Sequence, residues 1–178
     1  MDSINKNQSE DNFETLTASK AVEKIQEIVD HAKTCFFCTR GSNGTWLNSR
    51  PMNVRKVDDD GTLWFLSAND SHKNLELSKD SAVKLFFQGS PHSDFMEISG
   101  SATILSDRAK IDELWMPLIK TWFTEGKDDP RISVIRVTPE DGYYWDNKHG
   151  NAIAGMKMMV GAALGKTMDD SVEGELKV

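Results

Sequence analysis

Cysteine, long apolar runs and positive net charge are all scarce in this sequence of 178 residues, and each shortage narrows the class of protein. No stretch approaches the roughly 18 consecutive apolar residues that a membrane-spanning helix needs. The formal net charge of −7 argues against general binding to nucleic acid or to anionic membranes. Any anion that this protein binds must therefore be held by a local cluster of cations.

Two common enzyme motifs are also missing. The sequence has no Gly-x-Gly-x-x-Gly, and its strand-like segments do not alternate regularly with helices, so a dinucleotide-binding parallel sheet is not expected. It also has no Gly-x-Ser-x-Gly, the turn that carries the nucleophile in many hydrolases. The sequence therefore indicates neither that fold nor serine hydrolysis.

The only two cysteines, Cys35 and Cys38, have the spacing of some redox and metal-binding pairs. Their segment, 34–40, is aromatic and β-prone and precedes a Gly-Ser-Asn-Gly turn, so we expect a strand. Residues three apart in a strand point to opposite faces, whereas thioredoxin-like pairs lie at a helix N-terminus. We therefore expect two free structural thiols. The four histidines show no ligand spacing either, and no metal site is expected: His31, His72, His92 and His149.

Length and composition favour one globular, cytoplasmic domain with polar ends. Apolar residues make up 38% of the chain and charged residues 28%, and the length is well above the size at which a single core becomes marginal. The start is polar and acidic and lacks the basic and apolar regions of a signal peptide. We expect a disordered tail over 1–16, one folded domain over 17–165 and a flexible acidic tail over 166–178.

Helices are expected in three places. A one-faced helical period runs over 18–33, with Thr17 or Ser19 available as N-cap. A short helical turn follows at 72–79. A longer helical pattern covers 108–123, where Pro117 is expected to kink or divide the helix. The segment 152–164 is rich in small residues and methionine.

About seven short strands, mostly antiparallel, are expected between and after these helices. Asn, Asp and Gly turns separate the first three, which is typical of a β-meander. The last two are expected to be joined by a turn at Thr138-Pro-Glu-Asp-Gly142. The expected strands are 34–40, 46–57, 62–68, 82–88, 95–105, 132–137 and 143–146. Strands at this density usually close into a barrel or a sandwich.

Cations and hydroxyls gather in one hairpin of this acidic sequence. A strand that ends where a helix begins presents free backbone N–H groups, and side-chain cations beside them would complete a phosphate site. The alternative is a set of ordinary solvated surface residues. The residues concerned are Arg50, Arg55, Ser67, Ser71, His72 and Lys73.

Two segments of the sequence resemble one known family. Arg50-Pro-Met-Asn-Val-Arg55 with Leu63-Trp-Phe-Leu-Ser-Ala-Asn-Asp-Ser-His-Lys73 resembles the flavin-binding hairpin of the pyridoxamine 5′-phosphate oxidase family. Ile132-Ser-Val-Ile-Arg-Val-Thr-Pro-Glu-Asp-Gly-Tyr-Tyr-Trp145 is similar to that family's C-terminal strand pair. The general stress protein 26 branch is the better match, because Trp115-Met-Pro-Leu, Trp122-Phe and Glu125-Gly-Lys-Asp-Asp-Pro130 resemble it. The resemblance covers about residues 20–165.

The resemblance implies a mainly β fold, an antiparallel, Greek-key-like split barrel with flanking helices, that binds FMN at a homodimer interface. FAD is a possible alternative cofactor. The family's phosphate-binding positions match Arg50, Arg55, Ser71, His72 and Lys73, and the strand positions along the flavin match Pro51, Met52, Asn53, Leu66 and Ser67. Trp145 matches a tryptophan that reaches the flavin from the other chain.

One departure limits what the resemblance implies. The oxidase grips its pyridoxine substrate with an Arg-x-His pair shortly after the position of Trp145, and here no arginine occurs between Lys148 and Val178. Vitamin B6 oxidation is therefore not expected. Among residues near the ring, Tyr144 and His149 are candidate proton donors, although structural roles are favoured for both.

Three functions remain open from the sequence. The first is an FMN-dependent oxidoreductase of unknown substrate, and the second is a non-catalytic flavin-binding or redox-sensing stress protein. The third and weaker one is binding of haem or a deazaflavin, as in relatives. Trp115 and Trp122, seven residues apart, are expected on one helix face in the core or a dimer interface.

Overall fold

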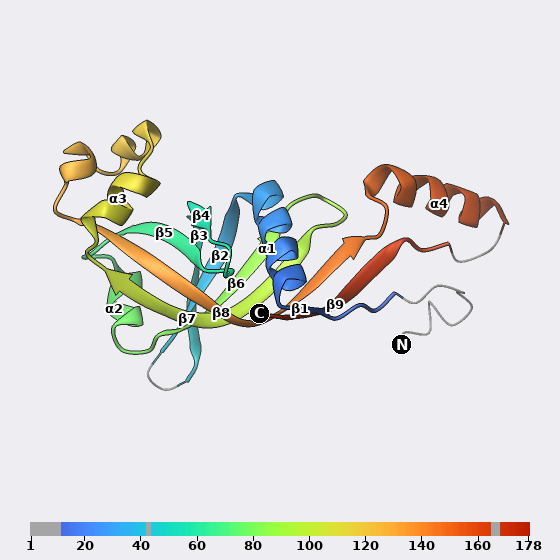
Figure 1. Cartoon of the computed structure of the whole chain (residues 1–178), viewed down its shortest axis with the longest axis horizontal. Coiled ribbons are helices and arrows are strands. Elements are labelled where there is room, and N and C mark those ends of the chain that lie inside the picture. Colours follow the sequence, from blue (N-terminus) through green and yellow to red (C-terminus); the bar gives the residue numbers. More distant parts are fainter. Residues whose placement is uncertain (1–11, 42–43, 165–167) are drawn as a thin grey trace.

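The computed structural model describes residues 12–41, 44–164 and 168–178, and most of its strands join in one long, curved sheet (Figure 1). The strands are β1 (Leu16–Thr17), β2 (Thr34–Arg40), β3 (Trp46–Asn53), β4 (Lys56–Val57), β5 (Leu63–Ala68), β6 (Ala82–Gln88), β7 (Phe95–Leu105), β8 (Ile132–Asn147) and β9 (Ser171–Lys177). The helices are α1 (Ser19–Ala32), α2 (His72–Leu77), α3 (Arg108–Leu114) and α4 (Asn151–Leu164), with 3-10 turns η2 (Pro117–Thr121) and η3 (Gly126–Asp128).

The order of the sheet is β1-β9-β8-β7-β6-β2-β3, and β5 pairs with both β4 and β8. The sheet curls without closing, as in a split barrel. Phe37 of β2 and Phe65 of β5 meet inside the curl at 5.3 Å between ring centroids, edge to face, and both are fully buried. The mainly β split-barrel expectation is confirmed.

The meander expected for the first three strands is present, with one addition. β2 and β3 form the first hairpin, and the end of the expected strand 46–57, β4, pairs with β5 across the turn at 58–61. Most of β5, however, pairs with β8, a strand far along the chain. Local turn chemistry shows where a chain reverses, but it does not show which distant strand offers the better apolar partner. The consequence for the site is that Ser67 of β5 lies opposite Ser133 of β8.

The expected turn at Thr138–Gly142 is also wrong, because β8 runs through it as one strand of 16 residues. The pairing of β7 with β8 shifts between Ser99 and Gly100, so Glu140 is the extra residue of a bulge. Gly100 lies so close to the bulge that an added Cβ would be 2.3 Å from the carbonyl oxygen of Thr138. Proline and glycine here bend a strand that continues.

Both expected tails extend too far into the folded chain. Ser171–Lys177 forms β9, which pairs with Asp141–Asn147 of β8 along its whole length. Leu16 and Thr17 form β1 against the other edge of β9. The expectation of a flexible tail over 166–178 is therefore wrong for the residues of β9. The disordered tail expected over 1–16 includes Leu16, which belongs to β1. Residues 1–11 and 165–167 lie outside the described part of the chain.

Helix α1 packs on the sheet through the side that the sequence predicted, with Ala21, Val22, Ile25, Ile28 and Val29 buried. Its N-cap is Ala18, which makes no side-chain cap hydrogen bond, so neither Thr17 nor Ser19 has the expected role. The predicted helix 108–123 is divided at Pro117, as expected. None of the helices in the described residues is long and apolar enough to cross a membrane.

Candidate functional site

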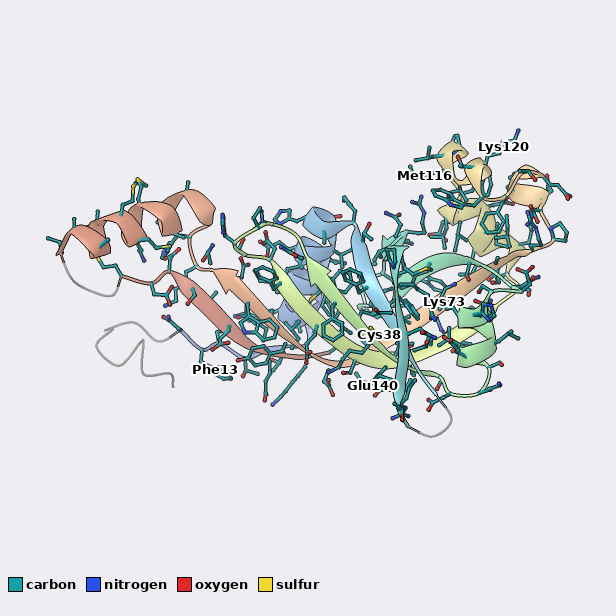
Figure 2. All side chains as sticks on the ribbon, turned by 180° about the vertical axis from the view of Figure 1, so that it is seen from behind. Phe13, Cys38, Lys73, Met116, Lys120 and Glu140 are labelled. Carbon is teal, nitrogen blue, oxygen red and sulfur yellow. The ribbon has the colours of Figure 1, made fainter. Side chains whose placement is uncertain are left out.

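A buried lysine marks the end of β5 and the start of α2 (Figure 2). Lys73 is only 6% exposed, and its Nζ donates to the Oγ of Ser67 at 2.5 Å and to the Oγ of Ser71 at 3.3 Å. Ser71 is the N-cap of α2 and accepts from the backbone N–H of Asn74. The cap thus fixes the serine that faces the lysine.

A second layer of polar groups holds these side chains in place. Ser67 Oγ donates to Asn74 Oδ1 at 2.8 Å, and Asn74 Nδ2 donates to Ser133 Oγ at 2.9 Å. Ser133 Oγ in turn donates to the backbone carbonyl of Ser67 at 3.0 Å. All three side chains are almost completely buried, and each finds hydrogen-bond partners within the network. The sequence analysis missed Asn74 and Ser133, although an asparagine three residues after a capping serine was a local signal.

Lys73 has no acidic partner in the described part of the chain, since its ammonium group donates only to the two serine hydroxyls there. Burial and, to a lesser degree, the charge of Arg50 lower the pKa of Lys73 to about 8, with Glu76 partly opposing both. A buried cation whose neighbours are hydroxyl groups and another cation is suited to an incoming anion.

Arg50 lies beside this lysine but is already paired. Its Nη2 lies 2.7 Å from Glu76 Oε2, and its Nη1 donates to Thr39 Oγ1 at 3.1 Å. Burial alone would raise the pKa of Glu76, but hydrogen bonds from Thr39, Arg50 and Asn48 outweigh it and the pKa is lowered. The structure thus brings Arg50 to the expected place and adds a carboxylate that sequence reasoning did not foresee.

Arg55 lies in a different hollow from Lys73. This cavity of about 610 Å³ is lined by Lys33, Asn53, Arg55 and Met116, among others. Arg55 donates to the backbone carbonyl of Leu114 at 3.2 Å and to Asn53 Oδ1 at 2.9 Å, and no carboxylate pairs with it in the described residues. Burial lowers its pKa. Arg55 is therefore a second cation available to an anion.

The other expected site residues are divided between the two faces of β3 and β5. Arg50 and Met52 lie opposite the buried Phe37 and Cys35 in the register of β2, and alternation therefore turns Pro51 and Asn53 to the other face. Leu66 is half-buried, and His72 is exposed. Whether these residues contact a flavin stays a prediction.

Trp145 lies far from Lys73 within one chain. Ser133 and Trp145 are both on β8, and twelve residues of strand span roughly 40 Å. Trp145 is 42% exposed and lines a separate, mostly apolar cavity of about 640 Å³ with Cys35, Phe36, Pro51 and Phe86. A single chain therefore does not bring the tryptophan to the lysine.

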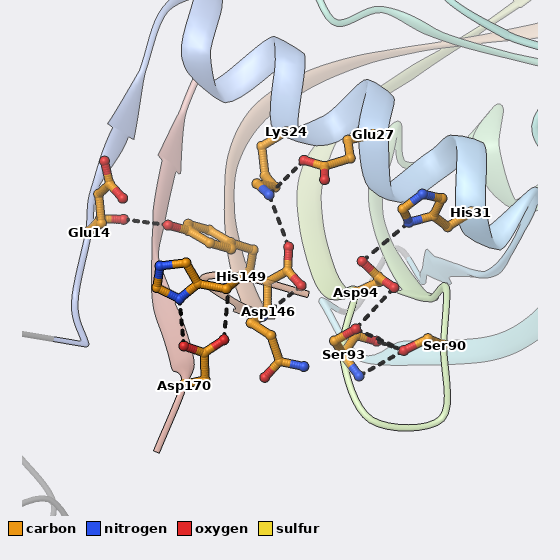
Figure 3. Close-up of polar contacts among 12 residues, drawn as sticks. Glu14, Lys24, Glu27, His31, Ser90, Ser93, Asp94, Asp146, His149 and Asp170 are labelled. Atoms are coloured by element: carbon orange, nitrogen blue, oxygen red, sulfur yellow. Dashed lines mark hydrogen bonds and ion pairs between the residues drawn. The ribbon is translucent and has the colours of Figure 1, made fainter. Parts of the chain in front are cut away.

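Tyr144 and His149, the candidate proton donors, are both engaged in structural contacts. Tyr144 is 1% exposed and donates to the backbone carbonyl of Glu14 at 3.0 Å, and burial raises its pKa to about 12. His149 Nδ1 lies 2.7 Å from the buried Asp170 (Figure 3). In the described residues, no group of three or more His, Cys, Asp or Glu side chains is placed to hold a metal.

The two tryptophans of the third helical region do not share a helix face. Trp115 ends α3 in an extended conformation and is partly buried against the cluster of Ile111, Leu114 and Phe123. Trp122 follows η2 and is 67% exposed. Pro117 lies between the two tryptophans and interrupts the helix, so the expectation that they share one helix face is wrong.

The cysteines behave as the sequence predicted. Cys35 is buried, Cys38 is half-exposed, and both are free thiols on opposite faces of β2. Burial raises the pKa of both, that of Cys35 to about 12. Neither is poised as a reactive thiolate.

Similarity to known proteins agrees with this geometry. Protein bli-3 of Neurospora crassa is 28% identical over 132 residues, which are 69% of this chain and 63% of bli-3. The chain therefore spans less than two thirds of that relative. General stress protein 26 of Bacillus subtilis is 25% identical over 67% of this chain and 84% of its own length.

Solved structures show the same fold. A putative general stress protein 26 from Jannaschia sp. CCS1 has a TM-score of 0.72 at 18% identity, covering 88% of this chain and 97% of the other. The general stress FMN/FAD binding protein of Xanthomonas citri has a TM-score of 0.59 at 27% identity, covering 68% of this chain and 85% of its own. Residues 20–169 match the family described as pyridoxamine 5′-phosphate oxidase like, and the chain belongs to that family.

Proposed function

We propose that this protein binds FMN, with its phosphate at Lys73, and that it works as a homodimer. The observation that carries the proposal is the buried ammonium group of Lys73, whose hydrogen bonds go to Ser67 and Ser71 and which has no carboxylate partner in the described residues. A phosphate supplies both the missing charge and several acceptors. The name of the Xanthomonas citri relative, a flavin-binding protein, supports the same ligand.

The donor set fits the phosphate group. Lys73 donates two of its three N–H groups to Ser67 and Ser71, which leaves the third for a phosphate oxygen, and the exposed His72 precedes it at the start of α2. Arg50 would have to give up its ion pair with Glu76 to contact the phosphate. We therefore expect Lys73 to contribute more to phosphate binding than Arg50. A bound flavin would supply hydride and electron transfer, while the chain supplies orientation and charge.

The length of β8 supports the proposed homodimer. Because roughly 40 Å of strand separates Trp145 from the lysine, the tryptophan reaches a flavin at Lys73 only from a second chain. The exposure of Trp145 in a mostly apolar cavity supports this. We further propose a cytoplasmic location.

We propose oxidoreductase activity as the first function and a non-catalytic flavin store or sensor as the second. The second is favoured by the engagement of Tyr144 with Glu14 and of His149 with Asp170, which leaves neither free for proton transfer. Turnover of reduced nicotinamide with an acceptor, above that of free FMN, separates the two.

The direct test of binding is the visible spectrum of the purified protein, followed by identification of what denaturation releases. FMN is expected. Titration of stripped protein with FMN and riboflavin should then show a preference for FMN of at least about a hundredfold, because two charge-assisted hydrogen bonds contribute roughly 1.5–3 kcal/mol each. Equal affinities for FMN and riboflavin would refute the phosphate site. Release of FAD or haem would show that the protein binds that group and not FMN.

A further inference from the structure

Helix α4 turns its large apolar side chains away from its own chain. The side that faces the chain carries the small residues Ala154 and Gly161, together with Lys157, whose Nζ lies 2.7 Å from the buried Asp170. The large apolar residues are instead 40–70% exposed: Ile153, Met156, Met158, Met159, Val160 and Leu164. A surface helix normally buries its apolar side, so α4 presents an interface.

A second exposed apolar surface lies at η2. Ile119 and Phe123 point into the chain, whereas Leu118 and Trp122, four residues apart, are 69% and 67% exposed. Met116, 44% exposed, continues this surface. Contiguous exposed apolar side chains of this size mark interaction sites.

The two surfaces lie at opposite ends of the chain and rise on the same side of the sheet, as both whole-chain views show (Figures 1 and 2). They cannot meet within one chain. Neither carries a carboxylate: 115–122 and 151–164 contain no Asp or Glu, although the whole chain has a net charge of −7. A contact between these surfaces therefore brings no two carboxylates together, and the lysine of α4, Lys157, is already paired with Asp170.

We propose that the occupant of both surfaces is a second copy of this chain, with α4 of each protomer packed on η2 of its partner. A contact between two different surfaces forms an open chain of molecules unless a two-fold arrangement closes it. Surfaces at opposite ends on the same side are both satisfied when two copies pair in antiparallel orientation. A stable interface takes about 800 Å² from each partner, and nine large, exposed apolar side chains provide a substantial share of it.

The contact would also complete the candidate site. Met116 belongs to the η2 surface and lines the hollow that holds Arg55. The partner's helix α4 would then border this hollow, so the hollow is enclosed only in the dimer. This inference rests on the homodimer of the proposed function and goes beyond it by naming the contacting elements.

The test uses two single substitutions in the full chain, Leu118→Asp on η2 and Met159→Asp on α4. Each places a charge in the proposed contact and should raise the dimer dissociation constant at least about tenfold, measured by sedimentation velocity against the 20.0 kDa mass of one chain. Circular dichroism should show an unchanged fold, because both side chains are exposed. Leu75→Asp, at a 54% exposed leucine of α2, is the matched control and should leave association unchanged.

Mixing the two variants gives the decisive result. A mixed dimer keeps one contact fully wild-type and combines both charges in the other, so it should be more stable than either variant alone. If α4 meets α4 and η2 meets η2, mixing restores nothing and the inference is overturned. It is also overturned if the variants dimerise like the wild type and α4 instead binds lipid vesicles.

Flavin binding is measured separately in the same samples. Wild-type protein that dimerises through these surfaces without binding FMN would remove the proposed flavin function and leave this contact standing. If the wild-type protein binds FMN while both variants dimerise normally, the flavin function stands and the proposed contact between α4 and η2 is overturned.

Discussion

The Nζ of Lys73 lies 2.5 Å from the Oγ of Ser67, and both side chains are more than nine-tenths buried. Serine here does not neutralise the lysine; it accepts one hydrogen bond and leaves the charge uncompensated. The cost of burying that charge is visible in a pKa lowered to about 8. A phosphate that bound there would offset this cost, which is why the pair is the centre of the predictions that follow.

Replacing the lysine tests whether its charge binds the phosphate. Lys73→Met should weaken FMN binding about ten- to a hundredfold, because one charge-assisted hydrogen bond contributes roughly 1.5–3 kcal/mol. Riboflavin lacks the phosphate, so its affinity should barely change. Fluorescence titration of both flavins measures this, with Lys79→Met, at an exposed lysine outside the cluster, as the control. Equal losses for both flavins would show that Lys73 supports the fold and does not contact the phosphate.

The lowered pKa predicts how FMN affinity depends on pH. Without ligand, Lys73 loses its proton around pH 8, well below the ordinary value of 10.5, and the neutral amine attracts phosphate poorly. FMN affinity should therefore fall about tenfold between about pH 7 and pH 9. The Lys73→Met variant should lack this fall, and riboflavin should show none in either protein. A wild-type profile that stays flat to pH 9 contradicts the proposed role of the lysine charge.

The thiols should differ in reactivity without forming a disulfide. Cys38 is half-exposed and should react with a thiol reagent in the folded protein, whereas Cys35 is buried with a pKa raised to about 12 and should react only on unfolding. Mild oxidation should leave two titratable thiols, because the side chains lie on opposite faces of β2. Cys38→Ser should abolish the fast reaction. An intramolecular disulfide in the oxidised protein would mean that β2 opens.

Asp170 fastens α4 to the sheet. Its buried carboxylate accepts from His149 and Lys157, and although burial alone would raise its pKa, these partners lower it to about 2. A lowered carboxylate pKa stabilises the folded state above the unfolded value of 3.8, and this contribution is lost as pH falls from there to about 2. Asp170→Asn should lower the free energy of unfolding, measured in urea, by about 2 kcal/mol at pH 7. The difference in stability between the variant and the wild type should become smaller at low pH.

The exposed Asp30, 77% exposed and paired only with Lys33, offers the control substitution Asp30→Asn. Its effect should stay within about 0.5 kcal/mol. If the Asp170→Asn protein were as stable as the Asp30→Asn protein, the contacts of Asp170 with His149 and Lys157 would contribute nothing to stability.

The sequence predicted strands best where apolar residues lie between clear turn signals. The bounds of 34–40, 82–88 and 95–105 agree with β2, β6 and β7. The strand β9 was missed because four of its seven residues are charged or glycine, although Val172, Gly174 and Leu176 alternate inward. Its stability comes from pairing with β8, a partner that no local pattern reveals.

The same limit applies to the candidate site. The cluster of Ser67, Ser71 and Lys73 could be predicted, because all three lie within one strand–helix junction. The pairing of Arg50 with Glu76 could not, since it depends on how β3 stands against α2. The division of Arg55 from Lys73 depends likewise on the curl of the sheet.

Replacement by alanine should have opposite effects on stability at two glycines, Gly100 beside the bulge of β8 and Gly155 in α4. At Gly100 an added Cβ would lie 2.3 Å from the carbonyl oxygen of Thr138, so Gly100→Ala must push β7 and β8 apart and should cost about 3 kcal/mol. At Gly155, in α4, an added Cβ meets nothing within 4 Å, and Gly155→Ala should stabilise by about 0.5–1 kcal/mol through helix propensity. Urea unfolding of both variants beside the wild type measures the pair. If Gly100→Ala were as stable as the wild type, the close approach at the bulge would be wrong and β8 would be free to turn at Thr138–Gly142, which would also release Trp145 from its place far from Lys73.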